Sequence, residues 1–299
     1  MAAVFTGVNI THLVINDHAP IFADLIELLT SSLDELGLSV RYSPNRLIRA
    51  RLNLILGHTV CFPPDWFAAL QNSGYPYVVF QAEALDSARG LVPLFPAYLD
   101  FLRAAAHVWD YSEANIRFLA GLGHPGVRHV PIGYAGRLER IVPAGVKDID
   151  ILFYGQPSDR RLRILEEMKG RGLRVQALWG VYGPARDQLI GRSKIVLNLH
   201  QFETSQLEQV RIAYLLNNRR FVISEVADCN PYGDGVVFCA REQLADCCAS
   251  YLRPGMEAER ERVARTGYAN LKALPMNECL RSALEGFAFA PGASGGPEP

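Results

Sequence analysis

One stretch constrains the fold more than any other: residues 194–225, which read KIVLNLHQFETSQLEQVRIAYLLNNRRFVISE. Its hydrophobic pattern predicts a short strand at Ile195–Leu199, a helix that stops at Asn217-Asn218, and a second strand at Phe221–Ile223. A strand–helix–strand unit this compact is a βαβ crossover, in which both strands are parallel and buried. The chain is therefore expected to be an α/β protein.

The same alternation of strand and helix patterns runs through both halves of the chain. Strands are predicted at Ile10–Ile15, Leu38–Tyr42, Leu52–Leu56, Tyr77–Phe80, His107–Tyr111, Arg128–Ile132, Ile151–Tyr154, Arg174–Leu178 and Val236–Cys239, besides the two above. The pattern lapses into glycine, proline and charge between Ala135 and Asp148. We therefore expect an α/β chain of two Rossmann-like, doubly wound domains that face a cleft.

The predicted domains are residues 1–134 and 150–290, joined by a linker at 135–149. The closing helices either stay with the second domain or pack back on the first. Residues 291–299, PGASGGPEP, contain no core-forming side chains, so a disordered tail is expected.

Composition excludes several functional classes. The net charge of -1 gives no reason to expect a nucleic acid partner. No apolar run approaches the roughly 18 residues of a membrane span, and no secretory signal is visible, so a cytoplasmic location is expected. The six cysteines include no C-x-x-C pair, which argues against a zinc site and favours reduced thiols.

Polar residues lie where the two predicted strands of residues 194–225 end. His200 follows the first strand, Glu208 lies at the helix between the strands, and Glu225 follows the second. In open α/β sheets, ligands bind at this carboxyl edge. A carboxylate near a helix start, such as that of Glu208, can accept hydrogen bonds from two vicinal hydroxyls. The alternative is an exposed helix glutamate paired with Arg211.

A second candidate site follows the strand that ends at Tyr154. Gly155 opens a turn into a helix, where free N–H groups favour phosphate, and Arg160 or Arg161 could add positive charge. Of the two arginines, Arg160 is the one expected to face the ligand. The alternative is that Ser158 merely caps the helix.

Two further groups of residues extend the candidate site. Trp179, Gly180 and Tyr182 form a glycine-flanked aromatic loop that could stack on a nucleobase or could simply be a packed turn. In the first half, Asp17-His18 and His58 follow predicted strands. Any of them could serve as general base for an acceptor hydroxyl, although a histidine at a strand end is often structural.

The segment Asp150–Leu252 resembles the nucleotide-sugar-binding half of GT-B glycosyltransferases, especially the short bacterial CgeB-like and group-1-like enzymes. Those enzymes carry glutamate, seven residues and a second glutamate at this strand–loop–helix. Glu208 matches the second glutamate, which binds the ribose hydroxyls, and His200 stands where the first would approach the donor sugar. In the first half only the alternation and the Val130–Tyr134 junction are similar to the family.

The resemblance implies a metal-independent glycosyltransferase without a bound cofactor. It would move a hexose-type sugar from a UDP-sugar or GDP-sugar to a hydroxyl or side chain of an unidentified acceptor. The expected catalytic residues are Asp17, His18, His58 and His200. The expected nucleotide-binding residues are Gly155, Ser158, Arg160, Arg161, Trp179, Gly180, Tyr182, Glu208, Arg211 and Glu225. Two alternatives stay open: a non-catalytic module that binds a nucleotide sugar or a partner enzyme, and a nucleotide-sugar epimerase of the same fold.

Overall fold

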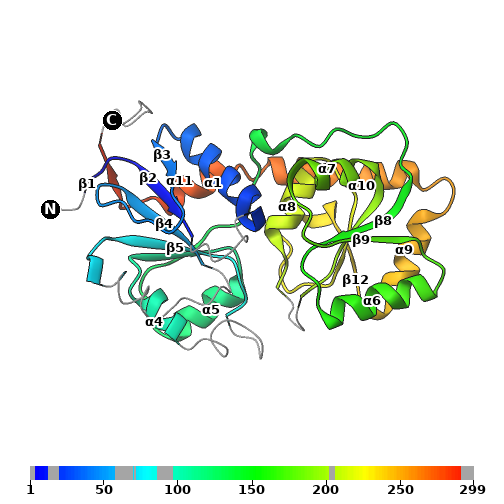
Figure 1. Ribbon diagram of the computed structural model, residues 1–299, viewed down its shortest axis with the longest axis horizontal. Helices are drawn as coiled ribbons and strands as arrows, with labels where there is room; N and C mark the ends of the chain where they lie inside the picture. The colour runs from blue at the N-terminus through cyan, green and yellow to red at the C-terminus, as the bar shows by residue number, and fades with distance from the viewer. Residues whose placement is uncertain are drawn as a thin grey trace. The chain divides into compact units, whose positions relative to one another are not determined.

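Parallel strands that alternate with helices build the chain into two units (Figure 1). The computed structural model describes residues 4–12, 20–57, 70, 72–85, 97–201 and 206–290. One unit comprises Met1–Ile132 together with Met276–Pro299, and the other is the continuous segment Gly133–Pro275. Within the described ranges, no helix has the length and apolar character needed to cross a membrane.

The first unit contains a six-stranded parallel sheet in the order β3-β2-β4-β5-β6-β7. Its strands are β2 Val8–Thr11, β3 Val40–Tyr42, β4 Leu52–Gly57, β5 Tyr77–Gln81, β6 His107–Asp110 and β7 Val127–His129. Every residue of β4 and β5 is buried, which fits central strands covered on both faces. The first strand lies earlier than the predicted Ile10–Ile15, because its pairing with β3 and β4 begins at Val8.

Helices cover both faces of this sheet: α1 and α11 lie on one side, α4 and α5 on the other (Figure 1). They are α1 Ala23–Glu35, α4 Ala97–Arg103, α5 Glu113–Gly121 and α11 Met276–Ala283. The Ser112 hydroxyl accepts from the Asn115 N–H and caps α5. The end of the described chain returns to its start, because β13 Ala288–Phe289 pairs with β1 Val4–Phe5.

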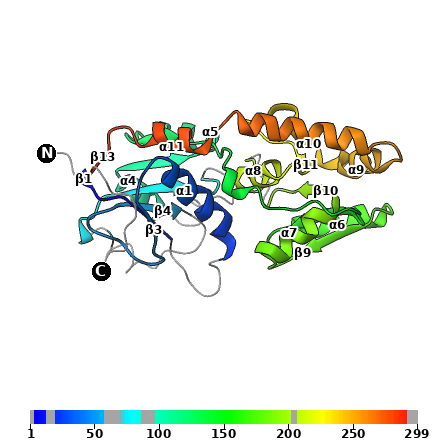
Figure 2. The same ribbon diagram turned by 90° about the horizontal axis from the view of Figure 1, so that it is seen from above.

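The second unit contains a five-stranded parallel sheet in the order β12-β11-β10-β8-β9. Its strands are β8 Ile149–Tyr154, β9 Val175–Leu178, β10 Ser193–Asn198, β11 Val222–Glu225 and β12 Val237–Cys239. Its helices are α6 Asp159–Gly170, α7 Gly183–Arg192, α8 Gln209–Asn217, α9 Leu244–Leu252 and α10 Glu257–Lys272. Figure 2 shows the same elements from above. Residues 194–225 thus form the unit β10–α8–β11, as predicted.

Alternate residues of these strands face the helices α6, α9 and α10. Ile151, Phe153, Ile195 and Leu197 are each 0% exposed and share one core cluster with the inner sides of those helices. Burying a side chain of this size contributes roughly 1.5–3 kcal/mol. This core fixes the carboxyl ends of β8 and β10, on which the candidate site stands.

Residues 135–148 belong to the second unit and do not behave as the predicted linker. Two adjacent asparagines at the end of α8 bind this segment. Asn217 exchanges hydrogen bonds with the backbone N–H and carbonyl of Ala135, at 3.2 and 3.1 Å. The side-chain oxygen Oδ1 of Asn218 accepts from the backbone N–H groups of Arg140 and Ile141, both at 2.8 Å. Residues 276–290 return to the first unit, which is the second of the two arrangements considered for the closing helices.

Helix α10 packs against the turn before β12 through two glycines. A Cβ built on Gly235 would lie 2.1 Å from the Cα of Gly267, and one built on Gly267 would lie 2.6 Å from Leu216 Cδ2. No side chain fits between the two backbones. The contact therefore requires glycine at both positions.

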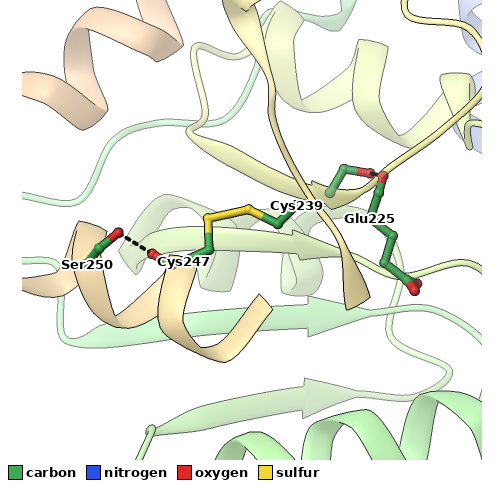
Figure 3. Close-up of a disulfide and its surroundings, with 5 residues drawn as sticks. Glu225, Cys239, Cys247 and Ser250 are labelled. Atoms are coloured by element: carbon green, nitrogen blue, oxygen red, sulfur yellow. Dashed lines mark hydrogen bonds between the residues drawn. A yellow bond between two sulfur atoms is a disulfide. The ribbon is translucent and has the colours of Figure 1, made fainter. Parts of the chain in front are cut away.

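One cysteine pair departs from the expected reduced state. Cys239, the last residue of β12, forms a disulfide with Cys247 of α9 (Figure 3). The two residues are eight positions apart, and the 3₁₀ turn Arg241–Gln243 brings them together. Among the described residues Cys248 and Cys279 are free thiols, and the buried Cys248 has its pKa raised to about 12 by desolvation.

Candidate functional site

The candidate site lies at the point where the strand order of the second sheet reverses. From β8 the chain moves outward to β9, then crosses back to β10 and continues to β11 and β12. The carboxyl ends of β8 and β10 therefore flank the position where open α/β sheets bind ligands. Gly155 follows β8, and Leu199-His200 follow β10. The predicted residues around Gly155, His200 and Glu208 are thus brought together at one edge.

Glu208 and His200 form a direct pair. Glu208 is the residue before α8, and its Oε2 lies 3.0 Å from Nδ1 of His200. The same oxygen accepts from Nδ2 of Asn198 at 2.8 Å. Within the described part of the chain no hydrogen bond reaches Oε1, which has Arg161 at 3.8 Å. The side chain of Glu208 is 25% exposed, whereas that of His200 is 3% exposed.

The partners of His200 fix the charge of its ring. Nε2 lies 3.0 Å from the carbonyl oxygen of Val226, and Nδ1 faces the Glu208 carboxylate. Neither partner can donate a hydrogen bond, so this geometry favours a ring that donates through both nitrogens. Burial opposes this charge, but the Glu208 carboxylate outweighs it and the pKa of His200 is raised. Burial also opposes the Glu208 charge, but His200, Arg211 and Asn198 lower the pKa of that carboxyl to about 2.

Asn198 connects the carboxylate to a neighbouring arginine. Its Nδ2 donates to Glu208 and to Ser224 Oγ, and its Oδ1 accepts from Nη1 of Arg211 at 2.8 Å. The side chain is 0% exposed. Asn198 thus orients both charged groups, and sequence reasoning missed it because it ends an apolar strand.

Arg160 and Arg161 are not equivalent. Arg160 forms a two-pronged ion pair with Glu225 and donates to the carbonyl of His200 at 3.0 Å. Arg161 is 2% exposed and donates to the carbonyls of Leu199 and Gln156 at 2.8–3.1 Å. Burial, followed by the charge of Arg211, lowers the pKa of Arg161 to about 10. Arg161 therefore supports the loop from inside the protein.

Ser158 and Glu225 also make internal contacts. The Ser158 hydroxyl accepts from the Arg161 N–H at 3.3 Å and caps α6, which agrees with the alternative considered from the sequence. Glu225 is 4% exposed and accepts from the His200 N–H at 2.7 Å as well as from Arg160. Its carboxylate thus fastens α6 to the loop after β10.

Arg211 is the arginine with the fewest partners at this edge. It is half-buried, and the bond to Asn198 is its one hydrogen bond with the described residues. Its guanidinium lies over the Tyr154 ring at 5.4 Å from the centroid. Nη2 approaches the turn after β8 so closely that a Cβ on Gly155 would lie 2.9 Å from it. Gly155, at φ +155°, therefore makes room for the guanidinium.

The charges at this edge do not balance. Among the described side chains that bind one another here, four are cations, Arg160, Arg161, His200 and Arg211, and two are carboxylates, Glu208 and Glu225. Within this set two positive charges are in excess. Concentrated positive charge beside a helix N-terminus favours an anionic ligand.

The aromatic loop after β9 lies beside the Gly155 turn. Trp179 packs on Phe153 with ring centroids 5.6 Å apart, so part of its surface belongs to the core. The Tyr182 hydroxyl accepts from Nε2 of Gln156 at 3.4 Å, which joins the two loops. Gly180 adopts φ +66°, a left-handed conformation that glycine favours.

The remaining predicted residues fall elsewhere. Asp17, His18 and His58 lie outside the described residues, as does the tail 291–299. Two aspartates not considered as site residues, Asp148 and Asp150, lie at the opposite end of β8, where Arg192 binds Asp148, and Lys194 and Arg174 bind Asp150. In the described ranges no three His, Cys, Asp or Glu side chains gather as a metal site.

The chain resembles known proteins over a larger part of its length in fold than in sequence. No protein-family model matches the chain. Two uncharacterized proteins of Acanthamoeba polyphaga mimivirus are similar in part. L140 is 26% identical over 171 residues, which is 52% of this chain and 55% of L140. L138 is 28% identical over 106 residues, which is 33% of this chain and 12% of L138. The matched region is therefore about half of L140 and a small part of L138.

Solved structures match nearly the whole chain. HepE from Anabaena, in complex with UDP and glucose, has a TM-score of 0.63 at 11% identity and covers 93% of this chain and 99% of its own. Sucrose-phosphate synthase from Thermosynechococcus elongatus has a TM-score of 0.58 at 12% identity, covering 92% and 97%. The lipopolysaccharide galactosyltransferase WaaB has a TM-score of 0.53 at 9% identity, covering 93% and 98%. The chain has the two-domain GT-B fold, as predicted.

Proposed function

We propose that the protein is a glycosyltransferase that transfers a sugar from a nucleoside diphosphate sugar to an acceptor hydroxyl or side chain. The observation that carries the proposal is that Asn198 holds Glu208 and Arg211 at the same edge, at the strand-order reversal. Glu208 presents a carboxylate oxygen, Oε1, and Arg211 presents guanidinium donors. A ribose diol and a diphosphate need these two kinds of partner.

Glu208 is suited to the ribose. Its low pKa keeps the carboxylate ionised at neutral pH, so it accepts and does not donate. With Oε2 held by His200 and Asn198, Oε1 is left for the ligand. Hydrogen bonds to a charged acceptor contribute roughly 1.5–3 kcal/mol each.

Arg211 and the excess of two positive charges are suited to the diphosphate. During transfer the bond between the anomeric carbon and the diphosphate oxygen breaks, and its electron pair stays on the diphosphate. A fixed cation at that position stabilises the transition state more than the ground state. This chemistry supports a transfer that needs no metal ion.

The nucleotide, the transferred sugar, the cellular location and the general base are more specific parts of the proposal. UDP is the nucleotide to test first, because HepE is bound to UDP and glucose. A UDP-sugar or GDP-sugar donor, a hexosyl group, a cytoplasmic location and a general base among Asp17, His18 and His58 are proposals. So is membership of the CgeB-like or group-1-like enzymes.

Titration calorimetry with UDP, GDP, dTDP and CMP tests the nucleotide site. We expect one diphosphate to bind, and Glu208→Ala to weaken that binding by ~10–100-fold while the fold is retained. Glu166→Ala on the exposed face of α6 is the matched control. Equal affinity in wild type and Glu208→Ala would remove Glu208 from the site.

A transfer assay with a panel of nucleotide sugars then tests the reaction, with EDTA expected to leave turnover unchanged. Conversion of the donor to an isomer without acceptor would identify an epimerase. Tight binding with neither hydrolysis nor transfer would identify a binding module.

A further inference from the structure

The loop after β10 places a charged histidine beneath the proposed ribose site. We propose that His200 is a positioning residue: a fixed imidazolium that holds Glu208 ionised, with one carboxylate oxygen turned to the nucleotide. This inference rests on the proposed function, because it concerns how the same site recognises its ligand.

The two hydrogen-bond partners of the His200 ring indicate that it is positively charged. One ring nitrogen donates to the Glu208 carboxylate at 3.0 Å and the other to the Val226 carbonyl at 3.0 Å. A neutral ring would turn a lone pair toward one of these oxygens, and that repulsion would be buried, since His200 is 3% exposed. The imidazolium satisfies both acceptors at once.

The backbone of His200 is fixed as well. Its N–H donates to Glu225 at 2.7 Å, and its carbonyl accepts from Arg160 at 3.0 Å. Together with the contact of Nε2 with the Val226 carbonyl, these bonds restrain the position of the ring. Glu208 is the partner that is held, and its χ angles are fixed by the contact with the ring.

In the part of the chain that the structure describes, the charged groups around the ring come from three elements. They are Glu208 and Arg211 at α8, Glu225 at the end of β11, and Arg160 and Arg161 on α6. The two carboxylates favour the imidazolium and the three arginines oppose it. The carboxylates win because one of them contacts the ring directly.

A consequence for catalysis follows. An imidazolium that donates through both nitrogens has no lone pair with which to remove a proton from an acceptor. His200 is then not a general base, and it also differs from a glutamate that would approach the donor sugar. The base has to come from another residue.

Two conservative variants separate the two contacts of the ring. The amide of His200→Asn can reach the position of Nδ1 and donate to Glu208, while that of His200→Gln can reach the position of Nε2 and donate to Val226. We expect His200→Gln to weaken UDP binding about tenfold or more at pH 7.5, and His200→Asn by about threefold. Glu166→Gln is the control for the fold and for a single charge change.

The pH dependence gives a readout that a merely structural role would not move. Without the imidazolium, burial raises the Glu208 pKa, so the carboxylate begins to take up a proton at mildly acidic pH and accepts fewer hydrogen bonds. The affinity ratio of wild type to His200→Asn should therefore grow by about threefold or more between pH 7.5 and 5.5. Taking the ratio at each pH cancels the titration of UDP itself. GDP replaces UDP if UDP does not bind.

Nitrogen-15 spectra of the histidine rings test the charge directly. The His200 signal is the one absent from His200→Gln and shifted in Glu208→Gln. Two protonated ring nitrogens at pH 7.5 are expected, and a neutral ring would overturn the proposal. Equal, pH-independent losses in both variants would also overturn it. If the wild type binds no nucleotide, the proposed function fails, and the spectra still decide the state of the ring.

Discussion

Arg211 provides the sharpest test of the diphosphate site. In Arg211→Gln the amide can keep the hydrogen bond to Asn198, but the positive charge is removed. The excess charge of the cluster falls from two to one. The variant cannot form a charge-assisted hydrogen bond to phosphate, so we expect UDP affinity to fall by roughly 10–150-fold, or ~1.5–3 kcal/mol.

Uridine separates this effect from a general loss of the site. It has the ribose and the base but no phosphate, so its affinity should be unchanged in Arg211→Gln and reduced in Glu208→Ala. Calorimetry with UDP and uridine on both variants measures all four values. The matched control is Arg163→Gln, which removes the same charge from the exposed side of α6.

The fold should tolerate the change. Arg211 is half-buried and makes one hydrogen bond to the described residues, so its substitution should cost about 1 kcal/mol of unfolding free energy. If UDP and uridine lose affinity equally, Arg211 does not contact the diphosphate. An unchanged UDP affinity would refute the site as argued.

Three further predictions concern stability. Arg161→Ala should lower the unfolding free energy by ~1–3 kcal/mol in urea titrations, because it leaves the buried Leu199 carbonyl and the part-buried Gln156 carbonyl without their donor; an unchanged unfolding free energy would contradict this. Gly267→Ala should cost ~1–3 kcal/mol through overpacking against Leu216 and Gly235, whereas Gly170→Ala, where a Cβ meets nothing within 4 Å, should be neutral or better in the same thermal melts. The Glu208 pKa is lowered from 4.5 to about 2, so its stabilisation is complete above pH 4.5 and is lost as pH falls. The His200 pKa is raised above 6.5, so its stabilisation is complete below pH 6.5 and is lost as pH rises through the folded value. Unfolding free energy from this pair should therefore be greatest between pH 4.5 and 6.5, and His200→Gln should abolish the decline above that range.

Local signals in the sequence predicted much of the second unit. The buried strands β8, β10 and β11 are short apolar runs, and Asn217-Asn218 end α8 as expected. Because polar residues after such strands must meet at one edge, the meeting of Gly155, His200 and Glu208 was also predictable. These features depend on residues close together in the chain.

Side-chain direction was harder to predict. Arg160 was expected to face the ligand, yet it binds Glu225, which is 65 residues away. The role of Asn198 depends on Ser224 and Arg211, which reach it only once β10 and β11 are paired. The return of residues 276–290 to the first unit depends on contacts with α1 and β1. Such long-range partners leave no periodic trace in the sequence.

The first unit is assembled from two segments that lie far apart in the chain. Among the described residues, the sheet partner of β1 at Val4–Phe5 is β13 at Ala288–Phe289, and α11 also follows the whole second unit in the sequence. The segment Gly133–Pro275 is continuous, so its core needs no residue from either of those two segments. A purified chain truncated after Pro275 should therefore protect the second unit from limited proteolysis better than the first.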